Sequence, residues 1–157
     1  MQLDIAKTTI FKEAKSVSQS IKIKGITIRN FKSLFDVSFE TGNVNVFIGA
    51  NGSGKTSVLE AIGVLSAAMT DRVNNNSLQR KGVRLSTSSL YKSKFADIVK
   101  ESPTVEFSLK WGKDSHEYQY NTHLTAPVGD DSWKYHTESV SRDGIIVFGR
   151  SNRSKSH

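Results

Sequence analysis

Alternating apolar and polar residues predict two strands near the start of the chain, followed by a third strand that is mostly apolar. The run from Ile21 to Phe31 has a period of two, interrupted once at Gly25, and Leu34–Glu40 repeats that period. Such a pattern is typical of strands with one buried face. Val44–Ile48 (VNVFI) has apolar residues at four of its five positions, so we predict a buried strand there.

The pattern changes to helical spacing after a glycine-rich stretch. Over Lys55–Met69 apolar residues lie nearly all round a helix, which predicts a helix buried on most of its sides. Residues 71–100 are rich in Asn, Ser and Lys, and we interpret them as a long, partly ordered connection with a short helix near Leu90–Val99.

A period of two returns after Pro103 and predicts an antiparallel meander. The hairpin signals are Gly112-Lys113-Asp114-Ser115 and Asp143-Gly144. The strands they separate are Val105–Trp111, His116–Leu124, Ser132–Val140 and Ile145–Arg150.

These elements predict an α/β fold with a mixed sheet around one buried helix, extended by the meander. A chain of 157 residues has the length of one domain. We place the domain at residues 21–150, with residues 1–20 as an N-terminal tail that carries a weakly amphipathic stretch, and residues 151–157 as a C-terminal tail.

Composition excludes several classes of protein. There is no Cys, which excludes disulfide scaffolds, Cys-based metal centres and thiol nucleophiles. The longest apolar stretch, Ala61–Met69, is too short to span a membrane, and residues 1–20 lack the apolar run of a signal peptide. We therefore predict a cytoplasmic protein without a membrane segment.

The strongest chemical signal is the sequence Gly49-Ala50-Asn51-Gly52-Ser53-Gly54-Lys55-Thr56, which fits the phosphate-binding pattern G-x-x-x-x-G-K-[ST]. Glycines let successive backbone N–H groups point inward at a phosphate, at the positive end of the following helix. Lys55 would lie between the β- and γ-phosphates, the Thr56 hydroxyl would bind Mg²⁺, and Ser57 offers a second hydroxyl. The alternative is a glycine-rich turn that binds nothing, but a strand before the motif and a helix after it favour the phosphate site.

A longer stretch of the chain resembles a known group of ATPases. The segments Ile26-Thr27-Ile28-Arg29-Asn30-Phe31-Lys32-Ser33 and Asn45–Ile62 are similar to the N-terminal lobe of the SMC/RecF/OLD group of ABC-like ATPases, often labelled AAA family ATPases. The similarity covers residues 24–65. It implies binding of ATP and Mg²⁺, with Arg29, Asn30 and Lys32 beside the nucleotide and with Lys55 and Thr56 serving catalysis. A different interpretation makes Arg29 and Lys32 solvated charges at a strand end.

Hydrolysis in that group needs a second, acidic motif, in which four apolar residues precede Asp and Glu. No Asp of this chain follows four apolar residues, and there is no L-S-G-G signature. The chain thus resembles only the first lobe of an ATPase head, and we expect a C-terminal lobe or a second head to complete it. Whether the chain is itself an enzyme stays open. A GTPase or kinase is a weaker alternative, since an N-K-x-D motif is lacking.

The basic residues suggest a second class of function. The net charge is +7, and residues 71–100 carry seven Lys or Arg against two Asp. Arg80, Lys81, Arg84, Lys92, Lys94 and Lys100 are candidates for a nucleic-acid contact. The alternative function is therefore a non-enzymatic module that binds DNA or a partner chain and keeps nucleotide as a structural ligand.

Other patterns have simpler explanations. His116, Tyr118 and Tyr120 share a strand face, which we attribute to packing more readily than to base stacking. The four histidines, His116, His123, His136 and His157, show no metal-ligand spacing, so we expect no metal besides the Mg²⁺ of the nucleotide.

Overall fold

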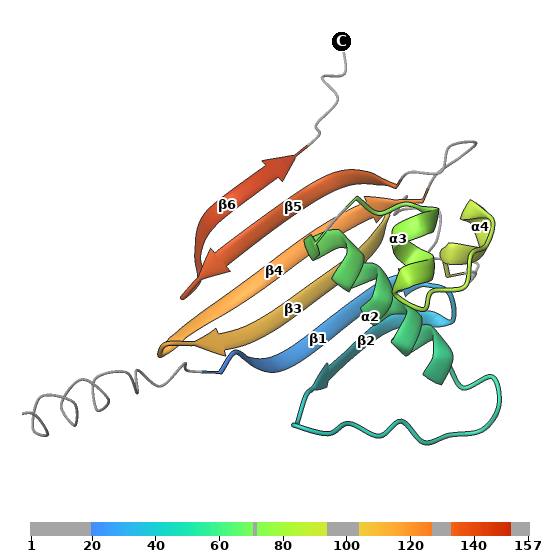
Figure 1. The fold of residues 1–157 in the computed structure, drawn as a ribbon, viewed down its shortest axis with the longest axis horizontal. Coiled ribbons are helices and arrows are strands. Elements are labelled where there is room, and N and C mark those ends of the chain that lie inside the picture. The colour runs from blue at the N-terminus through green and yellow to red at the C-terminus, as the bar shows by residue number, and fades with distance from the viewer. Residues whose placement is uncertain (1–19, 71, 94–103, 127–132, 152–157) are drawn as a thin grey trace, which may run out of the picture.

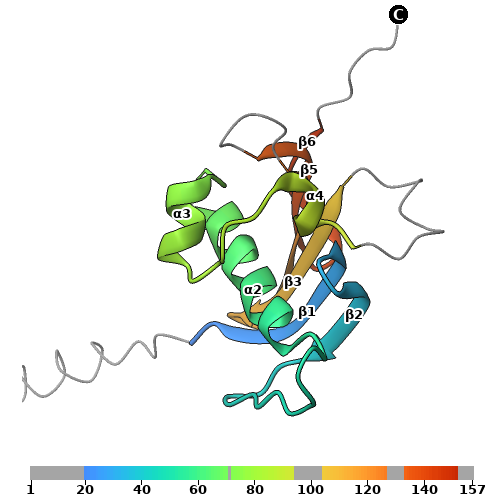
Figure 2. The same ribbon diagram turned by 90° about the vertical axis from the view of Figure 1, so that its right-hand side faces the viewer.

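The computed structural model describes residues 20–70, 72–93, 104–126 and 133–151. They form one six-stranded sheet with strand order β2-β1-β3-β4-β5-β6, in which every pair of neighbours is antiparallel. Figures 1 and 2 show α2 and α3 together on one side of this sheet. The strands are β1 (Lys22–Phe31), β2 (Leu34–Glu40), β3 (Val105–Lys113), β4 (His116–Thr125), β5 (Lys134–Arg142) and β6 (Ile145–Ser151).

Two tight hairpins confirm the predicted meander. Asp114 and Ser115 connect β3 to β4 with φ angles of 51° and 65°. Asp143 and Gly144 connect β5 to β6 with φ angles of 50° and 81°. Positive φ at both central residues matches the right-handed twist of the flanking strands, so these short turns fix the register of the meander.

The two faces of the sheet differ in chemistry. Ile26 and Ile28 of β1 are buried under α2 (Lys55–Thr70), where they join a core that includes Val64 and Leu65. Thr27 lies between these two isoleucines and points to the opposite, polar face of the sheet. On that face Thr27 pairs with Ser38 and Ser108, and the hydroxyls of Thr27 and Ser38 are 2.9 Å apart. The alternation seen in the sequence therefore directs the helix to one side only.

Two shorter helices follow α2. The first, α3 (Asn75–Arg80), starts at a capping box in which Asn74 Oδ1 accepts from the Ser77 N–H and Ser77 Oγ accepts from the Asn74 N–H. The second, α4 (Ser88–Tyr91), ends in a buried tyrosine that contacts Phe31 and Trp133, with ring centroids 6.4 and 4.9 Å away. No helix is predicted at α3, and α4 begins before the helix predicted near Leu90–Val99.

The prediction of a strand at Val44–Ile48 is wrong. This segment has no ladder partner among the described residues, and Val44, Val46 and Ile48 are 81%, 74% and 91% exposed. Phe47 alone turns inward, with its ring 5.5 Å from that of Phe39. An apolar run forms a buried strand only when another strand lies beside it, and the described chain offers none.

The prediction of a mixed sheet also needs correction. The sheet is antiparallel throughout the described residues. The prediction that α2 is buried on most of its sides is confirmed, because Glu60 and Gly63 are buried against other segments while residues such as Val64 face the core. Leu59 and Met69 are exposed apolar residues of this helix.

The aromatic face of β4 is explained by packing, as predicted. Tyr118 stacks on Trp111 with ring centroids 5.4 Å apart, and Tyr120 is buried. Residues 94–103 and most of both predicted tails lie outside the described residues. None of the helices in the described ranges has the length and apolar character needed to cross a lipid bilayer.

We predict that Gly63→Ala destabilises the fold, although alanine is the better helix former. A Cβ atom at Gly63 would lie 2.6 Å from Val83 Cγ2 and 2.8 Å from the Lys81 carbonyl oxygen. Relieving such overlap should cost about 1–3 kcal/mol of unfolding free energy, measured by urea denaturation. Ser66→Ala in the same helix is the control and should change stability by less than about 0.5 kcal/mol. Equal stability of the two variants would contradict the close approach of α2 to the segment after α3.

Candidate nucleotide-binding site

The glycine-rich loop has the backbone that its sequence predicts. Gly52 and Gly54 adopt φ angles of 83° and 92°, in the left-handed region that L side chains rarely enter. The Ser53 N–H donates to the Ala50 carbonyl at 3.2 Å, and the Val58 N–H donates to the Gly54 carbonyl at 2.9 Å, which begins α2. The N–H groups of Gly52, Gly54, Lys55 and Thr56 have no protein acceptor among the described residues. The loop and first turn of α2 therefore keep a set of donors available.

The Lys55 side chain folds back over this loop. Its Nζ donates to the carbonyls of Gly49 and Ala50, both at 2.7 Å, and lies 3.4 Å from Ser53 Oγ. A positive charge is thus held beside the donors of the loop, within the field of the helix N-terminus. Ammonium and amide groups together make this end of α2 attractive to an anion.

The turn between β1 and β2 packs against the loop. Ser33 Oγ and Ser57 Oγ are 2.9 Å apart, which links the turn to the first turn of α2. A Cβ atom at Gly54 would lie 3.2 Å from both Ser33 Oγ and Leu34 Cδ2. A glycine is therefore required at position 54 for two reasons: its φ angle is one that other residues rarely adopt, and a side chain would crowd Ser33 and Leu34.

A distant segment fixes the conformation of that turn. Asn30 and Lys32 have φ angles of 56° and 50°, which are uncommon for residues with side chains. The Lys32 N–H donates to the Tyr91 carbonyl at 2.9 Å, and the Ser93 N–H donates to the Asn30 carbonyl at 3.1 Å. Ser93 Oγ also donates to the Leu34 carbonyl at 2.7 Å. The residues after α4 thus hold the turn in place and bring Lys92 to the same side as Lys32.

A buried carboxylate joins three parts of the site. Glu60 of α2 is 2% exposed, and its oxygens accept from Lys32 Nζ at 2.6 Å and from Arg84 Nε at 2.7 Å. The Arg84 N–H also donates to it at 3.2 Å. Burial raises the pKa of Glu60, but the hydrogen bonds from Arg84 and Lys32 outweigh burial and hold that pKa below its usual value. The same bond raises the pKa of Arg84.

Sequence reasoning did not find this cluster. A glutamate between the apolar residues Leu59 and Ala61 of a helix signals a buried partner, because an unpaired carboxylate is costly to bury. The partners could not be read from the sequence, since Lys32 and Arg84 lie 28 and 24 residues away.

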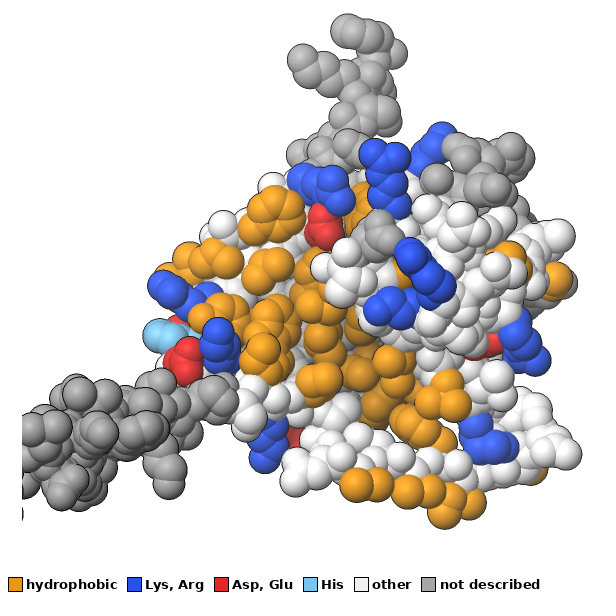
Figure 3. Space-filling model, viewed as in Figure 1, with side chains coloured by type: hydrophobic (Ala, Val, Ile, Leu, Met, Phe, Trp, Pro, Cys, Tyr) orange, Lys and Arg blue, Asp and Glu red, His pale blue; other side chains and the backbone are white. Residues whose placement is uncertain are grey.

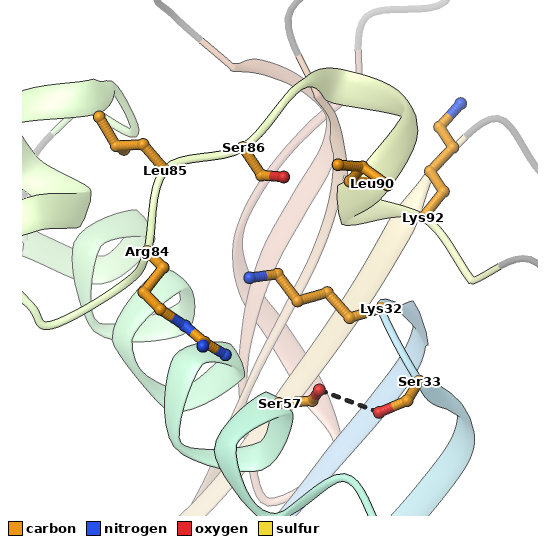
Figure 4. Close-up of a pocket in the computed structure, with 8 residues that line it drawn as sticks. All are labelled: Lys32, Ser33, Ser57, Arg84, Leu85, Ser86, Leu90 and Lys92. Carbon is orange, nitrogen blue, oxygen red and sulfur yellow. Dashed lines mark hydrogen bonds between the residues drawn. The ribbon is translucent and has the colours of Figure 1, made fainter. Parts of the chain in front are cut away.

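Figure 4 shows an open groove beside the first turn of α2, with Lys32 and Arg84 pointing toward each other across it. Its volume is about 580 Å³. Positively charged side chains, hydroxyl groups and two leucines line the groove. They come from the β1–β2 turn, from α2, from the segment after α3 and from the end of α4: Lys32, Ser33, Ser57, Arg84, Leu85, Ser86, Leu90 and Lys92. This combination suits a ligand that has both an anionic and a partly apolar part.

The structure brings some of the predicted residues together and separates others. Gly49–Ser57 form one unit, and Lys32 lies beside it in the groove. Arg29 is on the opposite face of the sheet, where Nε is 3.1 Å from Asp36 Oδ1 and Nη1 is 3.9 Å from Glu106 Oε2. Asn30 contributes backbone conformation at the turn.

The basic residues predicted for DNA are similarly divided. Arg84 and Lys92 line the groove, whereas Arg80 and Lys81 are exposed at the end of α3. Figure 3 shows Lys and Arg side chains over that part of the molecule. Lys94 and Lys100 lie outside the described residues.

The donors present suit a polyphosphate with a magnesium ion. The described residues contain no group of three or more His, Asp or Glu side chains that could hold a metal alone. The exposed Thr56 hydroxyl at the start of α2 is an oxygen ligand of the type that Mg²⁺ accepts, with phosphate oxygens supplying the others. Loops of the P-loop NTPase class combine glycines, a lysine and a hydroxyl residue at the start of a helix in the same way.

Comparison with known proteins gives the family. The sequence model of the AAA ATPase domain matches residues 21–124, which is most of the described chain, and the chain belongs to this family. It is an SMC/RecF-like P-loop ATPase sequence of the ABC type. The match includes the loop, α2 and the segments that form the groove.

Individual relatives are DNA replication and repair proteins RecF. The chain is 49% identical over 57 residues to that of Oenococcus oeni, covering 36% of this chain and 14% of the relative. It is 30% identical over 84 residues to that of Lactococcus lactis, covering 52% and 23%. It is 33% identical over 72 residues to that of Clostridioides difficile, covering 45% and 19%. The matched part therefore spans less than a quarter of the length of these relatives.

We predict that Glu60→Gln destabilises the protein in a pH-dependent way. Because the folded-state pKa of Glu60 is lowered, its stabilisation is complete above the usual pKa of glutamate, about 4.3, and is lost as pH falls through the folded value. At neutral pH the variant leaves Lys32 and Arg84 without their carboxylate and should lose about 3 kcal/mol in urea denaturation.

The control is Glu117→Gln, which removes an exposed carboxylate bonded to Lys24 at 2.8 Å. That variant should lose much less stability than Glu60→Gln does, because solvent screens an exposed ion pair. A Glu60→Gln cost that stays constant from neutral pH to below about pH 4 would contradict the assignment of a charged, paired Glu60.

Proposed function

We propose that this chain binds ATP·Mg²⁺ through Gly49–Thr56. The observation that carries the proposal is the set of N–H donors at Gly52, Gly54, Lys55 and Thr56, next to the ammonium of Lys55. Membership of an ATPase family supports it. The backbone donors bind the β-phosphate, and the helix N-terminus adds to the attraction.

Each residue of the loop has a role in this proposal. Lys55 releases the carbonyls of Gly49 and Ala50 and bonds the β- and γ-phosphates. Thr56 ligates the Mg²⁺ that bridges those phosphates, and Ser57 lies next to it at the edge of the groove. These contacts position the triphosphate, and the bound ion supplies charge neutralisation.

The groove would hold the nucleoside. Leu85 and Leu90 offer apolar surface for a base, while Lys32 and Lys92 supply positive charge next to the phosphates. Arg29 does not lie near this groove and takes no part in it.

We propose further that residues 21–150 are the N-terminal lobe of an ATPase head that acts in the cytoplasm. The lobe hydrolyses ATP slowly by itself, because the acidic motif that activates water is missing from the sequence. A C-terminal lobe or a second head would cover the outward apolar residues Leu59 and Met69 of α2 and the segment Val44–Ile48. Burying such side chains yields roughly 1.5–3 kcal/mol each.

We predict that Lys55→Ala weakens ATP binding at least about tenfold, since a charge-assisted contact to phosphate contributes about 1.5–3 kcal/mol. Isothermal titration calorimetry with ATP and Mg²⁺ measures the effect. Lys113→Ala, at the exposed end of β3, removes the same charge far from the loop and should bind as the wild type does. If Lys55→Ala and the wild type bound ATP equally, the proposal would be wrong.

A second function is supported by Arg80 and Lys81 at the exposed end of α3. The relatives are named as DNA replication and repair proteins, and we propose that Arg80 and Lys81 contact the DNA backbone. Such binding would be independent of base sequence and sensitive to salt.

We predict that the double variant Arg80→Gln, Lys81→Gln weakens duplex DNA binding and reduces the slope of log affinity against log salt by about 2. Fluorescence anisotropy at several salt concentrations gives that slope. The control, Lys110→Gln with Lys113→Gln on β3, makes the same change of net charge. The same slope for both double variants would exclude the end of α3 as the contact.

A further inference from the structure

The three serine hydroxyls that line the groove differ in their bonding. Ser33 Oγ and Ser57 Oγ are 2.9 Å apart and are bonded to each other. Ser86 Oγ has no hydrogen-bond partner among the described residues, although the N–H of the same residue is bonded. Figure 4 shows this hydroxyl pointing into the groove, toward the side on which Leu90 lies. A hydroxyl directed into a groove without a protein partner is available to a ligand.

Buried side chains hold the backbone that carries Ser86. Residues 84–86 belong to neither a helix nor a strand, so no regular ladder fixes them. The Ser86 N–H donates to Tyr91 Oη at 2.9 Å, and that oxygen lies 3.5 Å from the Arg84 carbonyl oxygen. At the other end of the segment, the Arg84 N–H donates to Glu60 Oε1 at 3.2 Å. Each end of the segment is therefore anchored to a side chain that the core holds in place.

Tyr91 connects the core to both walls of the groove. It is 2% exposed, and its ring lies 6.4 Å from that of Phe31 and 4.9 Å from that of Trp133. Its carbonyl accepts from the Lys32 N–H on the opposite wall at 2.9 Å. Burial raises the pKa of Tyr91, so the hydroxyl stays protonated at neutral pH. A phenylalanine would serve the ring contacts equally well, whereas the hydroxyl reaches only the segment that carries Ser86, within the described chain.

We propose that Ser86 is a specificity-determining residue, whose hydroxyl forms a hydrogen bond with the nucleoside of the bound nucleotide, and that Tyr91 positions it. This inference rests on the proposed binding of ATP, in which Gly49–Thr56 hold the phosphates. Figure 4 shows Ser86 on the far side of Lys32 from Ser57, the residue that follows the loop, so the hydroxyl lies away from the phosphates. Its partner is a ribose hydroxyl or a polar group of the base, because either can share a hydrogen bond with serine.

Calorimetry with ATP·Mg²⁺ and with tripolyphosphate·Mg²⁺ separates the nucleoside contact from the phosphate contacts. Ser86→Ala loses one neutral hydrogen bond and should weaken ATP binding about three- to tenfold. The same variant should leave tripolyphosphate binding unchanged within about twofold, since that ligand has no nucleoside. Ser86→Thr keeps a hydroxyl and should bind ATP as the wild type does. The matched control is Ser139→Ala on β5, which removes a hydroxyl outside the groove and should change neither affinity.

Tyr91→Phe tests the positioning role with the ring contacts kept. It should weaken ATP binding about three- to tenfold without weakening tripolyphosphate binding, whereas a purely structural role would leave the two affinities of the folded protein unchanged. Adding Ser86→Ala should weaken ATP binding little further, because both changes act through one hydroxyl. Tyr120→Phe is the control. It removes a similarly buried hydroxyl, bonded to Glu138 at 2.6 Å, and should bind ATP as the wild type does.

Deoxy analogues of ATP identify the group that Ser86 contacts. A preference for ATP over 2′-deoxyATP or 3′-deoxyATP that Ser86→Ala abolishes assigns the hydrogen bond to the ribose. Equal weakening of all three nucleotides by Ser86→Ala assigns it to the base. If Ser86→Ala bound ATP as the wild type does, or weakened tripolyphosphate to the same extent, this inference would fail while binding through the loop stands. A wild type that binds neither ATP nor tripolyphosphate would overturn the proposed function and this inference together.

Discussion

The candidate site depends on one buried carboxylate. Glu60 ties together α2, the β1–β2 turn through Lys32, and the segment after α3 through Arg84. These three parts form the walls of the groove next to the loop. Removing one partner of such a buried pair is costly, because the remaining charges lose their compensation. The ion cluster therefore sets the shape of the groove, while the glycines set the shape of the loop.

The parts of the fold that could be predicted are those fixed by local chemistry. The hairpin at Asp143-Gly144, the helix from Lys55 and the alternation in β2 all depend on residues close in sequence. The backbone of the glycine-rich loop was predictable too, because Gly52, Gly54 and the start of α2 at Lys55 lie close together in the sequence. The helix α3 was missed, although Asn74 and Ser77 have the spacing of a capping box, because its surroundings are polar.

What the sequence could not supply is the identity of distant partners. The segment Val44–Ile48 has the composition of a buried strand, yet strand formation needs a neighbour, and the described chain provides none. The position of Arg29 was predicted from the family pattern beside the nucleotide. The pleat of β1 instead directs its side chain to the polar face, toward Asp36 and Glu106.

The folded-back position of Lys55 bears on the energetics of anion capture. Its ammonium already neutralises the inward carbonyls of Gly49 and Ala50, so these dipoles do not push the loop apart. In the proposed complex an arriving polyanion would exchange partners with a side chain that already lies over the loop, and the backbone would need little ordering. Preorganisation of this kind lowers the entropic cost of association. Binding of a polyanion to such a loop would accordingly show a small heat-capacity change, and its association rate constant would be limited mainly by diffusional encounter.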